Sequence, residues 1–162
     1  MFIDFMAFAD DYTAQGEILL RDERLADQLA LAHEVRVDGA TVRALEDGRQ
    51  YDLAFAVIGL DELCAVVATG PRGNADLRHR TRAYPMRAEV GPYSVVGYLH
   101  AKPTADPLIA MQRRAIIALS PARLAFVRGS ERIEKSHDAL LLVSAKVGIV
   151  ESASDEDIGL LQ

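Results

Sequence analysis

The chain has 162 residues, of which half are apolar, a formal net charge of −6 and a single cysteine. No stretch approaches the roughly 18 consecutive apolar residues of a membrane-spanning helix, so no membrane partner is predicted. One cysteine excludes an intrachain disulfide framework, and the apolar start, which contains Asp4 and lacks a basic leader, is not typical of a signal peptide. We therefore expect a cytoplasmic protein.

The first half of the chain is predicted to form a β-hairpin, a helix and three further strands. Apolar residues recur through 2–8 and 12–20, and Asp10-Asp11 between them has turn chemistry. Leu25 and Leu29 follow with helical spacing. Three more β-type stretches complete this half, at residues 35–45, 50–58 and 62–69.

The second half has the same order of predicted elements. Strands at 82–90 and 93–101 flank a Gly91-Pro92 turn, and Asp106-Pro107 indicates a helix start, with Asp as the N-cap and Pro in the first turn. Three β-type stretches follow, at residues 116–127, 132–143 and 146–151. We assign residues 71–81, which begin with a Gly- and Pro-rich stretch, as a linker and residues 152–162 as a solvated acidic tail.

The two halves also align with one another. Tyr12 aligns with Tyr93 and Gly16 with Gly97 at an offset of 81 residues, Ala40 with Ala122 at 82, and residues 61–67 with 145–151 at 84. Small changes of offset are expected when insertions fall in loops. Two unrelated β-rich segments with similar apolar patterns are the alternative.

The predicted fold is mainly β with short helices (α+β). It consists of two tandem β-β-α-β-β-β repeats, at 1–70 and 82–151, each a small barrel-like or strongly bent antiparallel sheet. A unit of about 70 residues has a marginal core, so we expect the repeats to pack together or the chain to form homo-oligomers.

Charge is distributed unevenly along the chain. Residues 1–70 hold five Arg and no Lys against fourteen acidic residues, a net charge of −9, whereas residues 71–81 carry +2 and residues 82–162 carry +1. The two halves could attract each other, within one chain or between chains. Alternatively, the basic part could bind an anionic partner such as nucleic acid.

The first repeat resembles the Sm-like fold, on the segments T-A-Q-G-E-I-L, V-R-V-D-G-A-T-V and V-I-G-L-D-E-L-C-A-V-V. The resemblance implies a bent small barrel in which Gly16 is the bend glycine of the second strand and Gly59 lies before the last strand. Both repeats also resemble an uncharacterised bacterial domain family with Y-x-V-x-G-x-L-H and R-L-x-D-x-L segments, which carries no known activity. The Asn and the Arg/Lys-Gly of Sm-like RNA binders are missing, so the resemblance does not imply uridine-tract binding.

No catalytic, cofactor or metal motif is recognised. The four histidines form no His-x-x-x-His or Cys/His cluster, there is no phosphate loop or nucleophile elbow, and Cys64 lies in an apolar strand where an inert thiol is expected. We therefore predict no enzymatic activity, no cofactor and no metal.

One basic cluster stands out as a candidate contact surface. Its members are Arg72, Arg78, Arg80, Arg82, Tyr84 and Arg87. Interleaved Arg and an aromatic residue could bind a phosphate backbone and stack a base. Alternatively, these cations could pair with the acidic first repeat.

The sequence leaves three candidate functions open. The first is a non-enzymatic assembly or adaptor module that associates with itself or with another protein. The second is nucleic-acid or polyanion binding through the basic linker and second repeat. The third is a small-ligand sensor between the repeats, near Tyr12 and Tyr93.

Overall fold

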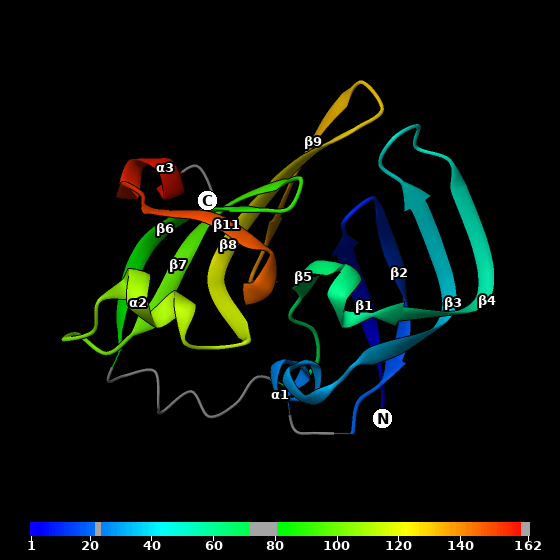
Figure 1. Ribbon diagram of the computed structural model, residues 1–162, viewed down its shortest axis with the longest axis horizontal. Helices are drawn as coiled ribbons and strands as arrows, with labels where there is room; N and C mark the ends of the chain where they lie inside the picture. Colours follow the sequence, from blue (N-terminus) through cyan, green and yellow to red (C-terminus); the bar gives the residue numbers. More distant parts are fainter. Residues whose placement is uncertain (22–23, 72–80, 160–162) are drawn as a thin grey trace.

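The computed structural model describes residues 1–21, 24–71 and 81–159 (Figure 1). These residues are mainly β with a few short helices, which confirms the predicted class. The first half contains, in chain order, β1 (Phe2–Ala9), β2 (Tyr12–Leu19), α1 (Leu25–Leu31), β3 (Glu34–Ala44), β4 (Gln50–Gly59), the 3-10 turn η1 (Leu60–Glu62) and β5 (Leu63–Val67).

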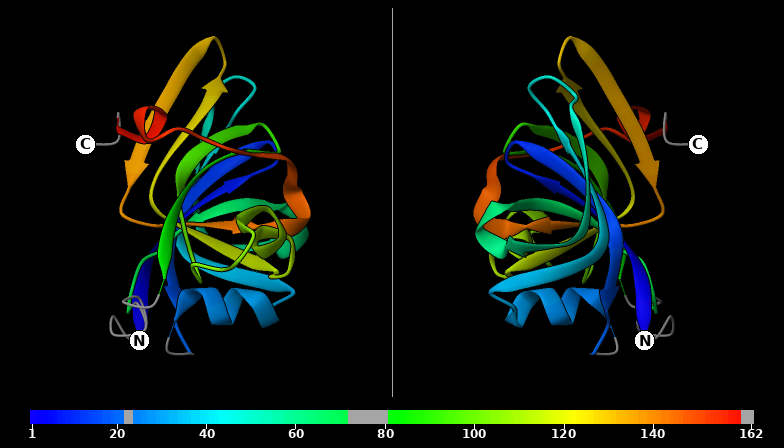
Figure 2. Two further views of the ribbon diagram at one scale, coloured as in Figure 1. Left: turned by 90° about the vertical axis from the view of Figure 1, so that its left-hand side faces the viewer. Right: turned by 90° about the vertical axis from the view of Figure 1, so that its right-hand side faces the viewer.

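The second half contains the same kinds of element and one more helix. In chain order these are β6 (Arg82–Val90), β7 (Tyr93–Ala101), α2 (Pro107–Gln112), β8 (Ile116–Arg128), β9 (Glu131–His137), β10 (Leu140–Val143), the 3-10 turn η3 (Ser144–Lys146), β11 (Val147–Ser152) and α3 (Asp155–Gly159). Figure 2 presents this half toward the viewer on the left and the first half on the right.

The structure differs from the prediction in two places near the C-terminus. The single strand expected at 132–143 is divided into β9 and β10, and both pair with β8. The division falls opposite Pro121, which has no N–H to donate to the ladder. The tail expected to be solvated contains α3, because Ser154 and Asp157 exchange side-chain-to-backbone hydrogen bonds at its start and Ile158 is buried.

The strands form one antiparallel sheet that does not close on itself. Its order is β11-β6-β7-β8-β10-β5-β1-β2-β3-β4, and β9 pairs with β8 beside this path. The two halves are joined where β10 pairs with β5. Within the described residues, the outer edges of β4 and β11 pair with no further strand.

The strand registers of the two halves correspond pair by pair. Phe5 lies opposite Gly16 in the first half, and Met86 lies opposite Gly97 in the second. β5 pairs with β1 as β11 pairs with β6, and each pairing contains one register shift. β9 and β10 together take the place of β4. In the first half, Val42 lies opposite Tyr51 and Val37 opposite Ala56. The corresponding pairs in the second half are Leu124 with Lys135 of β9 and Leu119 with Leu140 of β10. All of these pairs are related by the offsets 81, 82 and 84 that align the sequences.

Gly16 and Gly97 allow the same close approach of backbones. A Cβ atom on Gly16 would lie 2.6 Å from the Asp38 carbonyl oxygen, and one on Gly97 would lie 2.8 Å from the Pro121 carbonyl oxygen. Each glycine stands at the register shift between the second and third strands of its half. A side chain at either position would push the two strands apart.

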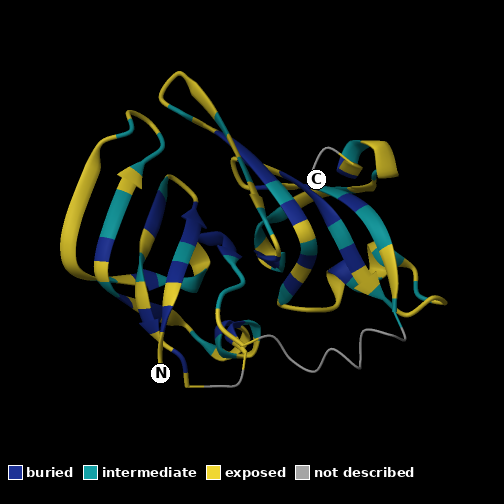
Figure 3. Cartoon of the chain, turned by 180° about the vertical axis from the view of Figure 1, so that it is seen from behind, coloured by how far each residue is buried: buried dark blue, intermediate teal, exposed yellow. Residues whose placement is uncertain are grey.

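The two hydrophobic cores exchange side chains between the halves. The core of the first half includes Leu141 and Val143 from the second, and the core of the second half includes Phe8 and Cys64 from the first. Figure 3 shows buried stretches on the strands of both halves. The halves therefore stabilise each other by shared burial.

Candidate interaction surfaces and cavity

The joint between the halves is a short buried strand ladder. Leu140, Leu141 and Leu142 of β10 lie opposite Val67, Val66 and Ala65 of β5. The three leucines, Val66 and Ala65 are each no more than 4% exposed. This ladder is continuous with the sheets on both sides, so the joint is a pairing of two strand edges.

Tyr93 of the second half forms a hydrogen bond to the first half beside the joint. Its hydroxyl donates to the Ala9 carbonyl at 2.6 Å, and the Tyr12 carbonyl lies 3.3 Å away. The ring contacts Phe8 and Phe126 edge-on, with centroids 5.5 Å and 5.4 Å apart. Burial raises the pKa of Tyr93 strongly, so the hydroxyl keeps its proton and remains a donor.

A polar contact lies beside this tyrosine. Lys146 Nζ is 2.8 Å from a carboxylate oxygen of Asp10, and the Cys64 thiol lies 3.4 Å from the same carboxylate. Burial, then the bond to Asp10, raises the pKa of Cys64 to about 12. The thiol is therefore protonated near neutral pH, a state that does not act as a nucleophile.

The outer strand β4 presents a row of apolar side chains to solvent. Tyr51, Leu53, Phe55 and Val57 are 47%, 45%, 49% and 52% exposed, and they share one face because they alternate along the strand. Arg36 covers part of this face, with its guanidinium carbon 4.2 Å from the Phe55 ring centroid. An apolar row beside an open strand edge is typical of a surface that pairs with another strand.

The opposite end of the sheet has a similar feature. β11 pairs only with β6 among the described strands, and Ile149 on it is 65% exposed. Among the described strands, the path of the sheet therefore ends in two open edges, β4 and β11, that carry exposed apolar side chains.

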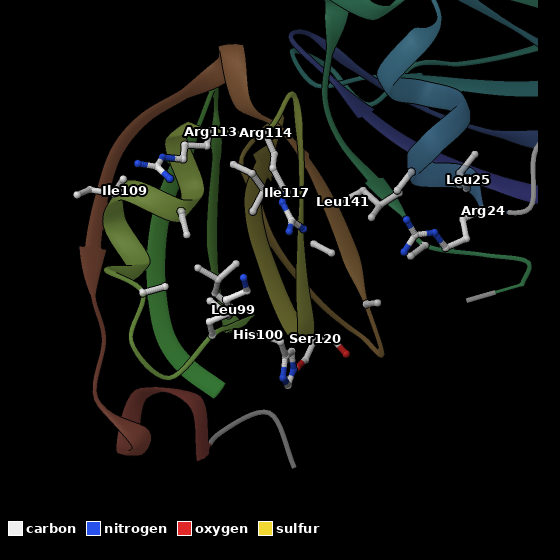
Figure 4. A pocket seen from close by; sticks show the side chains of 18 of the residues that line it. Arg24, Leu25, Leu99, His100, Ile109, Arg113, Arg114, Ile117, Ser120 and Leu141 are labelled. Carbon is white, nitrogen blue, oxygen red and sulfur yellow. The ribbon is translucent and has the colours of Figure 1, made fainter. Parts of the chain in front are cut away.

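A cavity of about 650 Å³ lies where the two halves meet, between α1 and α2 (Figure 4). Leu99, Ile117 and Leu141 form apolar parts of its wall. Arg24 and Arg114 come from different halves and extend toward Leu141, which lies between them in the view of Figure 4. This cavity lies away from Tyr12 and Tyr93, which do not line it.

The predicted basic cluster is only partly within the described residues. Arg72, Arg78 and Arg80 fall outside them. Arg82 lies over the Tyr84 ring, 5.3 Å from its centroid, and the Tyr84 hydroxyl donates to the Pro103 carbonyl at 3.0 Å. Arg87 pairs with Asp157 of α3 at 3.3 Å. These contacts stay within the second half.

Sequence reasoning missed a second group of cations, Arg43, Arg128 and Lys135. Arg128 donates to Thr13 at 3.1 Å, and Thr13 lies opposite Arg43 in the β2–β3 ladder. Burial, together with the neighbouring cations, lowers the pKa of both Arg128 and Lys135. The three residues are far apart in the sequence and meet only because the β8–β9 hairpin crosses to the first half, so no local motif could have shown them.

The remaining chemistry of the described residues is sparse. No group of three or more His, Cys, Asp or Glu among them could hold a metal ion. Within the same residues, no helix combines the length and the hydropathy needed to cross a membrane. His100 Nε2 is bonded to the Ser120 carbonyl at 2.7 Å.

No protein-family model, curated protein or solved structure matches this chain. Any functional conclusion therefore rests on the geometry described above.

Proposed function

We propose that the chain is a non-enzymatic assembly module of two equivalent β units that arose by duplication, and that copies of it join head to tail. The observation that carries this proposal is the joint inside the chain, where an edge of the second unit pairs with an edge of the first. The corresponding registers of the two halves support their equivalence.

Each unit has two edges, and the joint uses only one edge from each. The second unit contributes β10, which corresponds to the end of β4, and the first contributes β5, which corresponds to β11. At the positions equivalent to the joint, the edges left over are those of β4 and β11. If β4 of one copy pairs with β11 of the next, the contact between copies has the same form as the internal β10–β5 joint. Repetition of this contact gives a ring or a filament.

Burial at equivalent positions supports this pairing. Leu141 is 4% exposed inside the joint, whereas its equivalent Val57 is 52% exposed. Ala65 is 0% exposed, whereas its equivalent Ile149 is 65% exposed. Copying the register of the internal ladder places Val57 opposite Val150 and Ile58 opposite Ile149 of the next copy. Val57 and Ile149, which now face solvent, would then be buried.

The two equivalent tyrosines support the same conclusion. Tyr93 bonds across the joint, but the hydroxyl of Tyr12 has no hydrogen-bond partner in the described part of the chain. Burial and nearby carboxylates raise the pKa of Tyr12 to about 12, so it remains a donor. In a joint between copies, it would donate to the Val90 carbonyl of the next chain.

The joint between copies would be weaker than the internal one. The Lys146–Asp10 pair has no counterpart, because the equivalent positions are Glu62 and Gly91. Glu89 stands in the place of buried Phe8. A reversible assembly of intact chains is therefore expected.

A mixing experiment with two edge variants tests the proposal. Val57→Arg places a charge at the β4 edge and Ile149→Arg at the β11 edge, and both positions are more than half exposed, so the fold should tolerate them. Light scattering should show assembly of the wild-type chain at about 100 µM, since association follows mass action. Each variant alone should be monomeric, and an equimolar mixture should give a dimer, because each variant keeps the edge that the other lacks.

The matched control is Phe2→Arg on β1, which adds the same charge at an exposed apolar residue separated from β4 by β2 and β3 and should assemble like the wild type. Assembly of Ile149→Arg alone would show that β4 pairs with itself, and a mixture that stays monomeric would exclude the head-to-tail joint.

Polyanion binding is a second candidate function, favoured by the group of Arg43, Arg128 and Lys135. Binding of a labelled oligonucleotide should then fall steeply with salt and be lost when Arg43 and Lys135 are changed to Ser. An affinity that these changes leave intact would exclude that group.

A further inference from the structure

The cavity between α1 and α2 has the size and the apolar lining of a small-molecule site. Its volume of about 650 Å³ lies within the range of ligand pockets, about 300–1,000 Å³. Leu99, Ile117 and Leu141 in its wall are only 7%, 2% and 4% exposed, so they are held in place by the core. A ligand here would bury apolar surface against a fixed wall.

Most polar groups around the cavity already have partners. His100 is bonded to the Ser120 carbonyl at 2.7 Å, and the Asp106 carboxylate caps α2 by accepting from the Leu108 N–H at 2.9 Å. Arg24 is paired with Asp27 at 2.9 Å. These groups are satisfied without a ligand.

Three cations in the cavity wall differ from them. No ion pair with a described carboxylate is formed by these three, which are Lys102, Arg113 and Arg114. The one acidic side chain among the described lining residues is Asp106, and its carboxylate caps α2. Arg113 and Arg114 follow α2 directly and are exposed. A single negative group held above the apolar part of the cavity wall could pair with these cations.

We propose that this cavity binds an amphipathic anion, a ligand with one carboxylate or phosphate head and a flexible apolar tail. The head pairs with Arg114, whose side chain extends toward Ile117 and Leu141 (Figure 4), and the tail lies along these two residues and Leu99. A polyanion is a poor match, because Leu99, Ile117 and Leu141 would bring apolar surface against part of it. All of the described lining residues belong to one chain, so the proposed binding does not depend on the assembly of copies.

Titration calorimetry with four probes tests the site and its class of ligand. Decanoate and decyl phosphate carry both head and tail, decanol carries only the tail and acetate only the head. The full chain should bind the first two saturably and at least about tenfold more tightly than the others, since each 1.4 kcal/mol is a factor of ten. The preference between the first two distinguishes a carboxylate from a phosphate head.

Two variants locate the binding. Arg113→Ser/Arg114→Ser should weaken decanoate binding at least about tenfold and leave decanol unchanged. Arg49→Ser/Arg132→Ser removes the same charge elsewhere and should have no effect, because neither residue lines the cavity. Ile109→Glu, in the cavity wall, should abolish binding of decanoate, whereas Leu108→Glu on the same helix should not.

Three results would overturn the proposal. They are no saturable binding of decanoate or decyl phosphate to the folded wild-type chain, equal binding of acetate, and unchanged decanoate affinity in the double Arg variant. Circular dichroism spectra of all variants confirm that each is folded.

Discussion

Removing the hydroxyl of Tyr93 tests how the halves are held together. Tyr93→Phe keeps the ring against Phe8 and Phe126 but deletes the donor to the Ala9 carbonyl. Because the site is buried, the carbonyl has no water to replace the lost donor, and the expected loss of stability is about 1–3 kcal/mol. For a chain of this size, each 1 kcal/mol lowers Tm by about 2–4 °C.

Tyr12→Phe is the matched control for this change. It removes the same atom at the equivalent position, where the hydroxyl has no hydrogen-bond partner among the described residues, so we expect a loss below about 0.5 kcal/mol. Both changes are measured by urea unfolding on the Val57→Arg background, so that association of copies does not contribute. Equal losses for the two variants would refute the assignment of Tyr93 to the joint.

Three further predictions concern the units themselves. Gly16→Ala should cost about 1–3 kcal/mol by overpacking against the Asp38 backbone, whereas Gly148→Ala, whose Cβ would meet nothing closer than 3.8 Å, should stay within about 0.5 kcal/mol in thermal melts. Because the pKa of Cys64 is raised from 9.0 to about 12, the folded state holds the thiol proton more tightly than the unfolded state does. The contribution of this proton to the free energy of unfolding is complete below pH 9. It is lost as pH rises from 9 toward 12, by up to about 1.4 kcal/mol per pH unit. Cys64→Ala should make that slope shallower in urea unfolding at several alkaline pH values, and an unchanged slope would contradict the burial of the thiol. Ile158→Asp should release α3, seen as faster proteolysis after residue 152 with little change in Tm; unchanged proteolysis would show that α3 is held by other contacts.

Much of the local structure could be predicted from the sequence because its signals are local. The Asp106-Pro107 pair starts α2 through the expected cap, and the alignment of Gly16 with Gly97 found two positions where backbones approach closely. The division of 132–143 was missed because its cause, Pro121, lies on the neighbouring strand.

The joint and the cavity could not be predicted, because they depend on pairings between distant residues. Nothing in the short run of leucines from Leu140 specifies Val66 as a partner rather than any other apolar strand. The same holds for Lys146 and Asp10, whose contact follows from the ladder beside them. The basic cluster was predicted from proximity in sequence; in its described part, Arg82 lies over the ring of Tyr84 and Arg87 pairs with Asp157.

The β10–β5 ladder also has a consequence during synthesis. Val67 leaves the ribosome 75 residues before Leu142. Synthesis of those residues takes about 4–15 s at typical elongation rates. During that interval, the edge of β5 that pairs with β10 in the finished chain has no partner strand. On a polysome, neighbouring nascent chains offer one another the same unpaired edge. Production of this protein should therefore be sensitive to translation speed and to chaperones that bind extended apolar segments.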